Sequence, residues 1–150
     1  MKINKITSHF LKRIKKGWDI RYCQYDEKYL ITDGYKLFLL NEDEVQFNLS
    51  LATKVNSLAE TWEDAIKADV RLNYKLSKKD CAGLDLVNKY QNEDSTITTY
   101  INDEYLKFFN LEECYLYTKR EKEASPVVIK EGEKAVGVVL PINLERDAKF

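Results

Sequence analysis

The sequence is poor in the residues that make long loops, disulfide frameworks and histidine chemistry. Its 150 residues include five Gly, two Pro, three Cys and a single His. So few Gly and Pro leave little room for long loops. The cysteines are an odd number, widely spaced and without a C-x-x-C pair, which favours reduced core side chains over the alternative of a metal or redox role. They are Cys23, Cys81 and Cys114.

Long apolar runs are also missing. No stretch approaches the roughly 20 apolar residues that a transmembrane helix needs, and residues 1–5 lack the apolar segment of a secretion signal. We therefore expect a cytoplasmic protein without a membrane partner. Neither a G-x-x-x-x-G-K-[ST] loop nor a G-x-G-x-x-G fingerprint is present, so we expect no nucleotide cofactor, and the sequence points to no other cofactor.

Catalytic residues are equally scarce. A Ser/His/Asp or Cys/His mechanism would have to use His9, and a zinc site would need the same side chain together with scattered cysteines. Acidic groups at 42–44, 60–64 and 112–113 suit Mg²⁺ or acid–base work, but in a chain that is 33% charged they are better explained as solvated surface. We predict a protein that is not an enzyme. A hydrolase remains a third hypothesis, which gains support if His9 lies in a cleft beside Ser, Cys or a carboxylate.

The residues that are plentiful indicate one domain with a core and an uneven charge. The chain is 44% hydrophobic and contains ten Tyr, six Phe and two Trp, enough large side chains for a core or a contact surface. The net charge is -1, yet residues 1–21 carry seven Lys or Arg against one acid. A basic amino end on an acidic protein favours contact with an anion, although a basic helix is also often only solvated.

Apolar spacing and turn residues predict the first third of the fold. A short strand is expected at 2–4. Apolar residues at every fourth position from Ile6 to Ile14 predict a helix over about 7–16, which Gly17 ends. Asp-Glu and Asp-Gly turns then join antiparallel strands. The expected strands are 19–25, 28–32, 35–40 and 45–49.

The remaining elements complete an α+β pattern without a linker or repeat. A capping box from Ser57 to Glu60 predicts a helix of about 12 residues. Apolar alternation predicts a strand over 70–76, and Asn102 is expected to cap a short helix. We predict a mostly antiparallel α+β fold in a single domain, 1–150. The other expected elements are a helix from 77 and strands at 96–101, 114–119, 126–130 and 135–142.

Three segments resemble parts of one domain of the bacterial DNA sliding clamp family. Residues 29–37 read Tyr-Leu-Ile-Thr-Asp-Gly-Tyr-Lys-Leu, similar to the clamp strand that ends at Thr-Asp-Gly and continues with an aromatic residue or His, a basic residue and Leu. Residues 101–109 are similar to the entry into the second helix of a clamp domain. Residues 125–144 resemble the carboxy-terminal hairpin, whose last strand carries a Val-Val-Met-Pro-Met-Arg-Leu type of run.

The resemblance implies a single clamp-like domain. Its expected fold is a curved, mostly antiparallel sheet with two helices packed on one face, plus an inserted helical segment at about 50–95. An alternative alignment makes 77–90 the second helix. The chain departs from the clamp pattern where Tyr35 replaces His, Lys36 and Asn143 replace Arg, and Leu140 replaces Met.

The resemblance also implies two binding surfaces. In the clamp family the Thr-Asp-Gly segment and the Pro-bearing strand line a groove that docks peptides of polymerases and repair proteins, with a basic residue at its rim. In a one-domain chain the two halves of that groove are expected to meet only when copies associate head to tail, as a homo-oligomer. The matching docking residues are Thr32, Gly34, Tyr35, Lys36, Leu37, Val138, Leu140 and Pro141. The basic helix matches the DNA-lining helices of the family through Lys12, Arg13, Lys15 and Lys16.

Two functional hypotheses result. The first is a non-enzymatic clamp-like binding protein of DNA replication or repair, which docks partner peptides and contacts duplex DNA without sequence preference. The alternative is a small interaction or inhibitor protein of a phage or mobile element that binds a host protein. Both involve protein partners, and only the first includes duplex DNA as an additional partner.

Overall fold

The computed structural model describes residues 1–76, 87–120 and 125–142. Its strands form an eight-stranded sheet in the order β4-β1-β2-β3-β11-β10-β9-β5 and a three-stranded sheet in the order β6-β7-β8. Pairing is antiparallel except between β1 and β4. The elements are α1 (Ile3–Lys15), β1 (Arg21–Tyr25), β2 (Lys28–Thr32), β3 (Lys36–Asn41), η1 (Glu42–Glu44), η2 (Leu49–Leu51), β4 (Thr53–Lys54), α2 (Leu58–Ala65), β5 (Val70–Arg71), β6 (Tyr74–Leu76), β7 (Val87–Gln91), β8 (Thr98–Asn102), α3 (Asp103–Leu106), β9 (Cys114–Thr118), β10 (Val127–Glu131) and β11 (Lys134–Val139).

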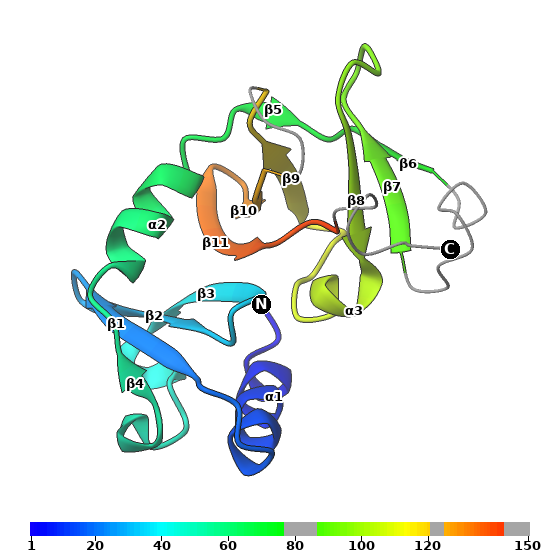
Figure 1. The fold of residues 1–150 in the computed structure, drawn as a ribbon. Helices are drawn as coiled ribbons and strands as arrows, with labels where there is room; N and C mark the ends of the chain where they lie inside the picture. Colours follow the sequence, from blue (N-terminus) through cyan, green and yellow to red (C-terminus); the bar gives the residue numbers. More distant parts are fainter. Residues whose placement is uncertain (77–86, 121–124, 143–150) are drawn as a thin grey trace.

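The predicted α+β class and the mostly antiparallel sheet are confirmed. Figure 1 shows the large sheet curving from β4 round to β5, with α2 on one side and α1 and α3 on the other. Among the described residues, no helix combines the length and apolar character that crossing a bilayer requires.

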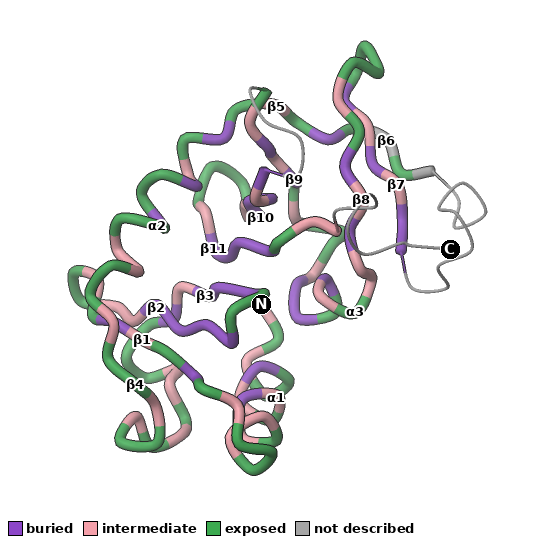
Figure 2. Tube along the Cα trace, viewed as in Figure 1, coloured by how far each residue is buried: buried purple, intermediate pink, exposed green. Residues whose placement is uncertain are grey.

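Two hydrophobic clusters lie on the two faces of the large sheet. Because side chains alternate along a strand, Phe38 joins the first cluster and Leu37 joins the second. Figure 2 shows that most of β3 and the second half of β11 are buried, and both strands contribute residues to both clusters. The first cluster receives Ile6 from α1 and Leu106 from α3, so two helices pack on one face as expected. The second receives Trp62 from α2, which belongs to the expected insertion.

The ends of α1 are partly as predicted. Gly17 has φ +81° and its N–H donates to the carbonyl of Ile14 at 3.0 Å, while Trp18 N–H donates to Arg13 at 3.0 Å, which is a Schellman stop. The predicted strand at 2–4 is wrong because the helix already begins at Ile3. Ile3, one turn before Ile6, extends the apolar stripe backward and packs on the first cluster.

Other differences have local causes. The predicted strand at 45–49 is wrong, because 45–48 are irregular and lie between two short 3₁₀ turns, at which the Asn41 N–H donates to Glu44 and Asn48 accepts from the Ser50 N–H. The predicted strand 70–76 splits, because β5 pairs with β9 while β6 pairs with β7 in the second sheet. The helix expected to begin at 77 falls on residues 77–86, which lie outside the described part of the chain. The alternative alignment, in which 77–90 is the second helix, is wrong at its end because 87–90 belong to strand β7.

Gly137 on β11 permits the closest packing in the first cluster. A Cβ added there would lie 2.5 Å from Cζ of Phe109 and 3.3 Å from the carbonyl oxygen of Leu37. The edge of the Phe109 ring therefore packs against the strand at Gly137, and the ring is stacked on Phe38 with centroids 5.5 Å apart. Glycine is required at this position because a side chain would collide with Phe109, and not because the backbone adopts a conformation that favours glycine.

Candidate functional site

The two segments that resemble the clamp groove lie side by side in one chain. Strand β3 pairs with β11 so that Leu37 faces Val138, and the N–H of Leu140 donates to the carbonyl of Tyr35 at 2.9 Å. The expectation that the two segments meet only through head-to-tail association is therefore wrong. Sheet pairing within the chain is sufficient.

Burial divides the eight predicted docking residues into two groups. Leu37 and Val138 are each 6% exposed and belong to the second cluster. By contrast, Tyr35 is 47% exposed and Leu140 is 40% exposed. Thr32 and Lys36 are buried, Gly34 is exposed, and Pro141 is half-buried. Tyr35 and Leu140 are thus the apolar side chains of the set that a partner can reach.

An aromatic row extends from Tyr35 on both sides. Its ring centroid lies 6.0 Å from that of Trp18 and 6.2 Å from that of Tyr105. The Arg13 guanidinium stacks over Trp18 at 3.9 Å. We call the surface formed by Trp18, Tyr35, Tyr105 and Leu140 the aromatic ledge. No sequence pattern indicated that Trp18, which follows a helix stop, would join this surface.

A buried ion cluster lies under the Asp-Gly hairpin. The Asp33 carboxylate is wholly buried, and its Oδ2 lies 2.9 Å from Nζ of Lys36 and 2.7 Å from Nε2 of His9. The Lys36 side chain is 2% exposed, and its ammonium lies 4.3 Å from the centroid of the Tyr105 ring. The predicted place of Lys36 at a groove rim is therefore corrected. Lys36 is a buried cation that pairs with Asp33 within the same hairpin.

The hairpin itself holds the carboxylate in place. Oδ1 of Asp33 accepts the N–H groups of Tyr35 at 3.0 Å and Lys36 at 3.1 Å. The Thr32 hydroxyl donates to the Lys36 carbonyl and accepts from the N–H of Gly34, whose φ of +97° favours glycine. The conformation that presents Tyr35 on the ledge therefore depends on polar contacts beneath it.

Charge and burial act against each other in this cluster. Burial alone would raise the pKa of the Asp33 carboxyl, but the hydrogen bond from His9 and the nearby ammonium of Lys36 outweigh it and hold that pKa well below its usual range. For Lys36, burial lowers the pKa and the Asp33 carboxylate only partly restores it. Asp33 is consequently ionised at neutral pH, so Nε2 of His9 donates to it.

His9 does lie beside a carboxylate and lines a hollow of about 400 Å³, the setting named for the hydrolase hypothesis. Within residues 1–76, 87–120 and 125–142, however, its ring nitrogen bonds to Asp33 and to no hydroxyl or thiol. A nucleophile paired with an imidazole is thus not part of this arrangement.

The basic residues of α1 are mostly solvent-facing. Lys12, Lys15 and Lys16 are exposed, whereas Arg13 is half-buried against Trp18. Three of the four predicted DNA-contact side chains are therefore accessible on one helix. The fourth, Arg13, links α1 to the aromatic ledge because it stacks on Trp18.

The described cysteines are free thiols. Cys23 is buried and Cys114 is half-buried. Burial is the largest influence on each thiol and raises the pKa of both. Cys81 lies outside the described residues. Within the described part of the chain, His, Cys, Asp and Glu side chains do not gather in a group that would hold a metal ion.

Fold and site together define an α+β protein whose curved sheet carries an exposed aromatic ledge beside a basic helix. Comparison of the chain with protein-family models, with curated proteins and with solved structures finds no match.

Proposed function

We propose that this chain is a non-enzymatic, clamp-like binding protein that acts in the cytoplasm in DNA replication or repair and docks peptides of partner proteins on its aromatic ledge. The observation that carries the proposal is the pairing of β3 with β11, which puts exposed Tyr35 opposite exposed Leu140. These residues belong to the two segments that resemble the clamp groove. The resemblance supplies the partner class, and the exposed side chains supply the contact.

The ledge has the chemistry of a peptide-docking surface. Tyr and Trp side chains provide large, rigid contact area and are the commonest residues to dominate binding energy. Neighbouring Arg13 and Trp18 stack on each other, and the ion cluster under the hairpin restrains Tyr35. A restrained surface loses less conformational entropy on binding than a mobile one.

Docking predicts that Tyr35→Ala lowers affinity for partner peptides about tenfold or more, about 1.4 kcal/mol. Fluorescence anisotropy with labelled peptides from the clamp-binding segments of polymerases and repair proteins measures it. Leu51→Ala is the matched control, since Leu51 is 54% exposed on η2 and lies outside the ledge. Equal binding by Tyr35→Ala and Leu51→Ala, or no binding by the unaltered chain, contradicts the proposal.

The basic face of α1 supports an additional contact with duplex DNA. Exposed lysines that meet phosphates bind without sequence preference and release counterions, so the affinity falls steeply with salt. We predict that Lys15→Gln/Lys16→Gln reduces the slope of log affinity against log salt by about 1 for each lost contact. Titrating a duplex oligonucleotide at several salt concentrations measures the slope. A slope identical to that of the unaltered chain removes α1 from the DNA contact.

The alternative function is an interaction or inhibitor protein of a phage or mobile element that occupies a host protein. The exposed ledge favours it as well, because an aromatic surface accepts either a short peptide or the surface of a folded partner. Affinity capture from a host lysate separates the two, with Tyr35→Ala as the negative control. Capture of a host protein outside the replication machinery, lost in the variant, favours the alternative.

A further inference from the structure

The hollow that His9 lines lies between α1 and the residue pair that follows α3, and none of the four ledge residues lines it. It encloses about 400 Å³ and has Phe108 as its apolar wall. Residues on one face of α1 line it at a spacing of one helical turn, and the two residues after α3 complete it. Its polar lining consists of Asn4, Lys5, Ser8, His9, Lys12 and Lys107.

Among the described residues, the lining contains donors and cations and no carboxylate. Two acids that pair with lining residues are already engaged. Asp33 is wholly buried behind His9, and Glu104 pairs with Lys107 at 2.8 Å. That outer pair is about half exposed on each side, so an incoming anion can compete for the ammonium. Lys5 and Lys12 are exposed and line the hollow from positions two turns apart on α1.

His9 is held in a fixed orientation at the inner wall. Its Nε2 donates to the ionised carboxylate of Asp33 at 2.7 Å, and the edge of its ring meets Phe108 with centroids 5.0 Å apart. A carboxylate behind an imidazole fixes the ring and its tautomer, as in many anion and metal sites. The hollow thus has one ordered wall in addition to its flexible lysines.

We propose that this hollow binds the phosphate group of a small phosphomonoester. Three lysines line one small space, which favours a ligand group with two negative charges, and a phosphomonoester carries that charge near neutral pH whereas a backbone phosphodiester does not. The hydroxyl of Ser8 and the amide of Asn4 add neutral donors, and Phe108 offers an apolar surface to the rest of the ligand. This site is independent of peptide docking on the ledge.

The experiment compares a phosphomonoester with a phosphodiester. Calorimetric titration at low ionic strength with inorganic phosphate, ribose 5-phosphate and dimethyl phosphate is expected to show binding of the first two and at least tenfold weaker binding of the diester. In Lys5→Gln/Lys107→Gln, affinity for ribose 5-phosphate is expected to fall at least tenfold. Addition of phosphate is also expected to shift the NMR signals of the His9 ring in the unaltered chain and not in the variant.

The matched control is Lys54→Gln/Lys75→Gln, which removes the same charge from exposed positions on β4 and β6. If this control variant binds ribose 5-phosphate within twofold of the affinity of the unaltered chain, the result supports the site. Equal losses in the two double variants mean a general charge effect and overturn it, as does equal binding of dimethyl phosphate.

Discussion

Asp33→Asn is expected to destabilise the fold by about 3 to 5 kcal/mol, because it leaves the buried ammonium of Lys36 without its counter-ion. The Lys36 side chain is 2% exposed, so water does not replace the lost charge. The substituted amide keeps an oxygen for the N–H groups of Tyr35 and Lys36, which isolates the effect of charge. Denaturant unfolding followed by circular dichroism measures the loss.

Two further variants make this result interpretable. Glu104→Gln breaks the exposed pair with Lys107 and is expected to cost about 0 to 1 kcal/mol. Asp33→Asn/Lys36→Met removes both charges and is expected to recover much of the stability, since a buried pair is often replaceable by apolar groups. An Asp33→Asn variant no less stable than Glu104→Gln would show that Lys36 is not held as a buried cation.

The same carboxylate sets a pH dependence with a defined sign. The pKa of Asp33 is lowered in the folded state from the ordinary 3.8, so its contribution is fully present above that value. As the pH falls below it, the unfolded chain takes up a proton that the folded protein does not, and stability decreases. Asp33→Asn is therefore expected to lose less stability than the unaltered chain when the pH falls through this range.

Local sequence signals explain which elements could be predicted. The strand at 28–32 was predicted with the bounds that the structure shows, because the Asp-Gly turn marks its end. The cap at Asn102 also holds, with its side chain accepting the N–H of Glu104 at 3.0 Å. In contrast, no local pattern says that 70–76 divides between two sheets, because that depends on which distant strands pair with each half.

The candidate site was predictable to a similar extent. The motif resemblance assigned Tyr35 and Leu140 to one docking surface, but it did not predict that β3 and β11 pair within one chain. Lys36 carried a signal that was overlooked, since in β3 it shares a face with Phe38, which belongs to the buried first cluster. Its counter-ion Asp33 is local, but the second partner of that carboxylate, His9, comes from a helix 24 residues earlier. Contacts over such a separation follow from tertiary packing, which a single sequence does not reveal.

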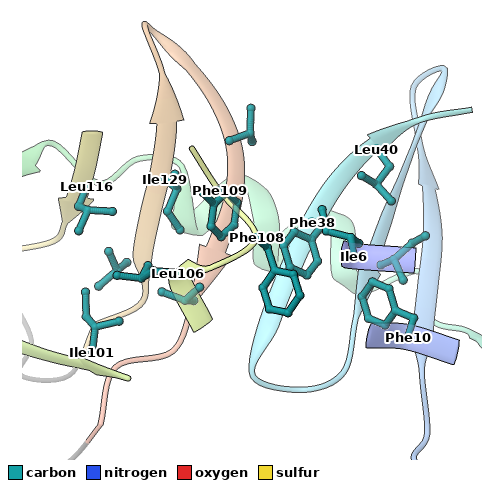
Figure 3. Packing of buried hydrophobic residues seen from close by; sticks show 14 of the residues in the cluster. Ile6, Phe10, Phe38, Leu40, Ile101, Leu106, Phe108, Phe109, Leu116 and Ile129 are labelled. Carbon is teal, nitrogen blue, oxygen red and sulfur yellow. The ribbon is translucent and has the colours of Figure 1, made fainter. Parts of the chain in front are cut away.

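Phe38→Ala is expected to cost about 3 to 5 kcal/mol, because it removes the ring that joins both helices of the first cluster to the sheet. Phe38 is fully buried, and its ring centroid lies 5.8 Å from that of Phe10 and 5.5 Å from those of Phe108 and Phe109. Figure 3 shows it between the α1 side chains and the residues that follow α3. Thermal and denaturant unfolding measure the loss, and Leu51→Ala, on an exposed side chain, is expected to change stability by less than about 0.5 kcal/mol.

Amide hydrogen exchange locates the effect of Phe38→Ala. Because the two clusters occupy opposite faces of the sheet, the cavity is expected to weaken protection first around Ile6 in α1 and Leu106 in α3. Protection around Trp62 in α2, which packs on the other face, is expected to fall only with global unfolding. Equal and simultaneous loss at all three positions would mean that the faces unfold as one unit. The aromatic ledge and the phosphate hollow would then depend on a single cooperative core rather than on the α1 and α3 face alone.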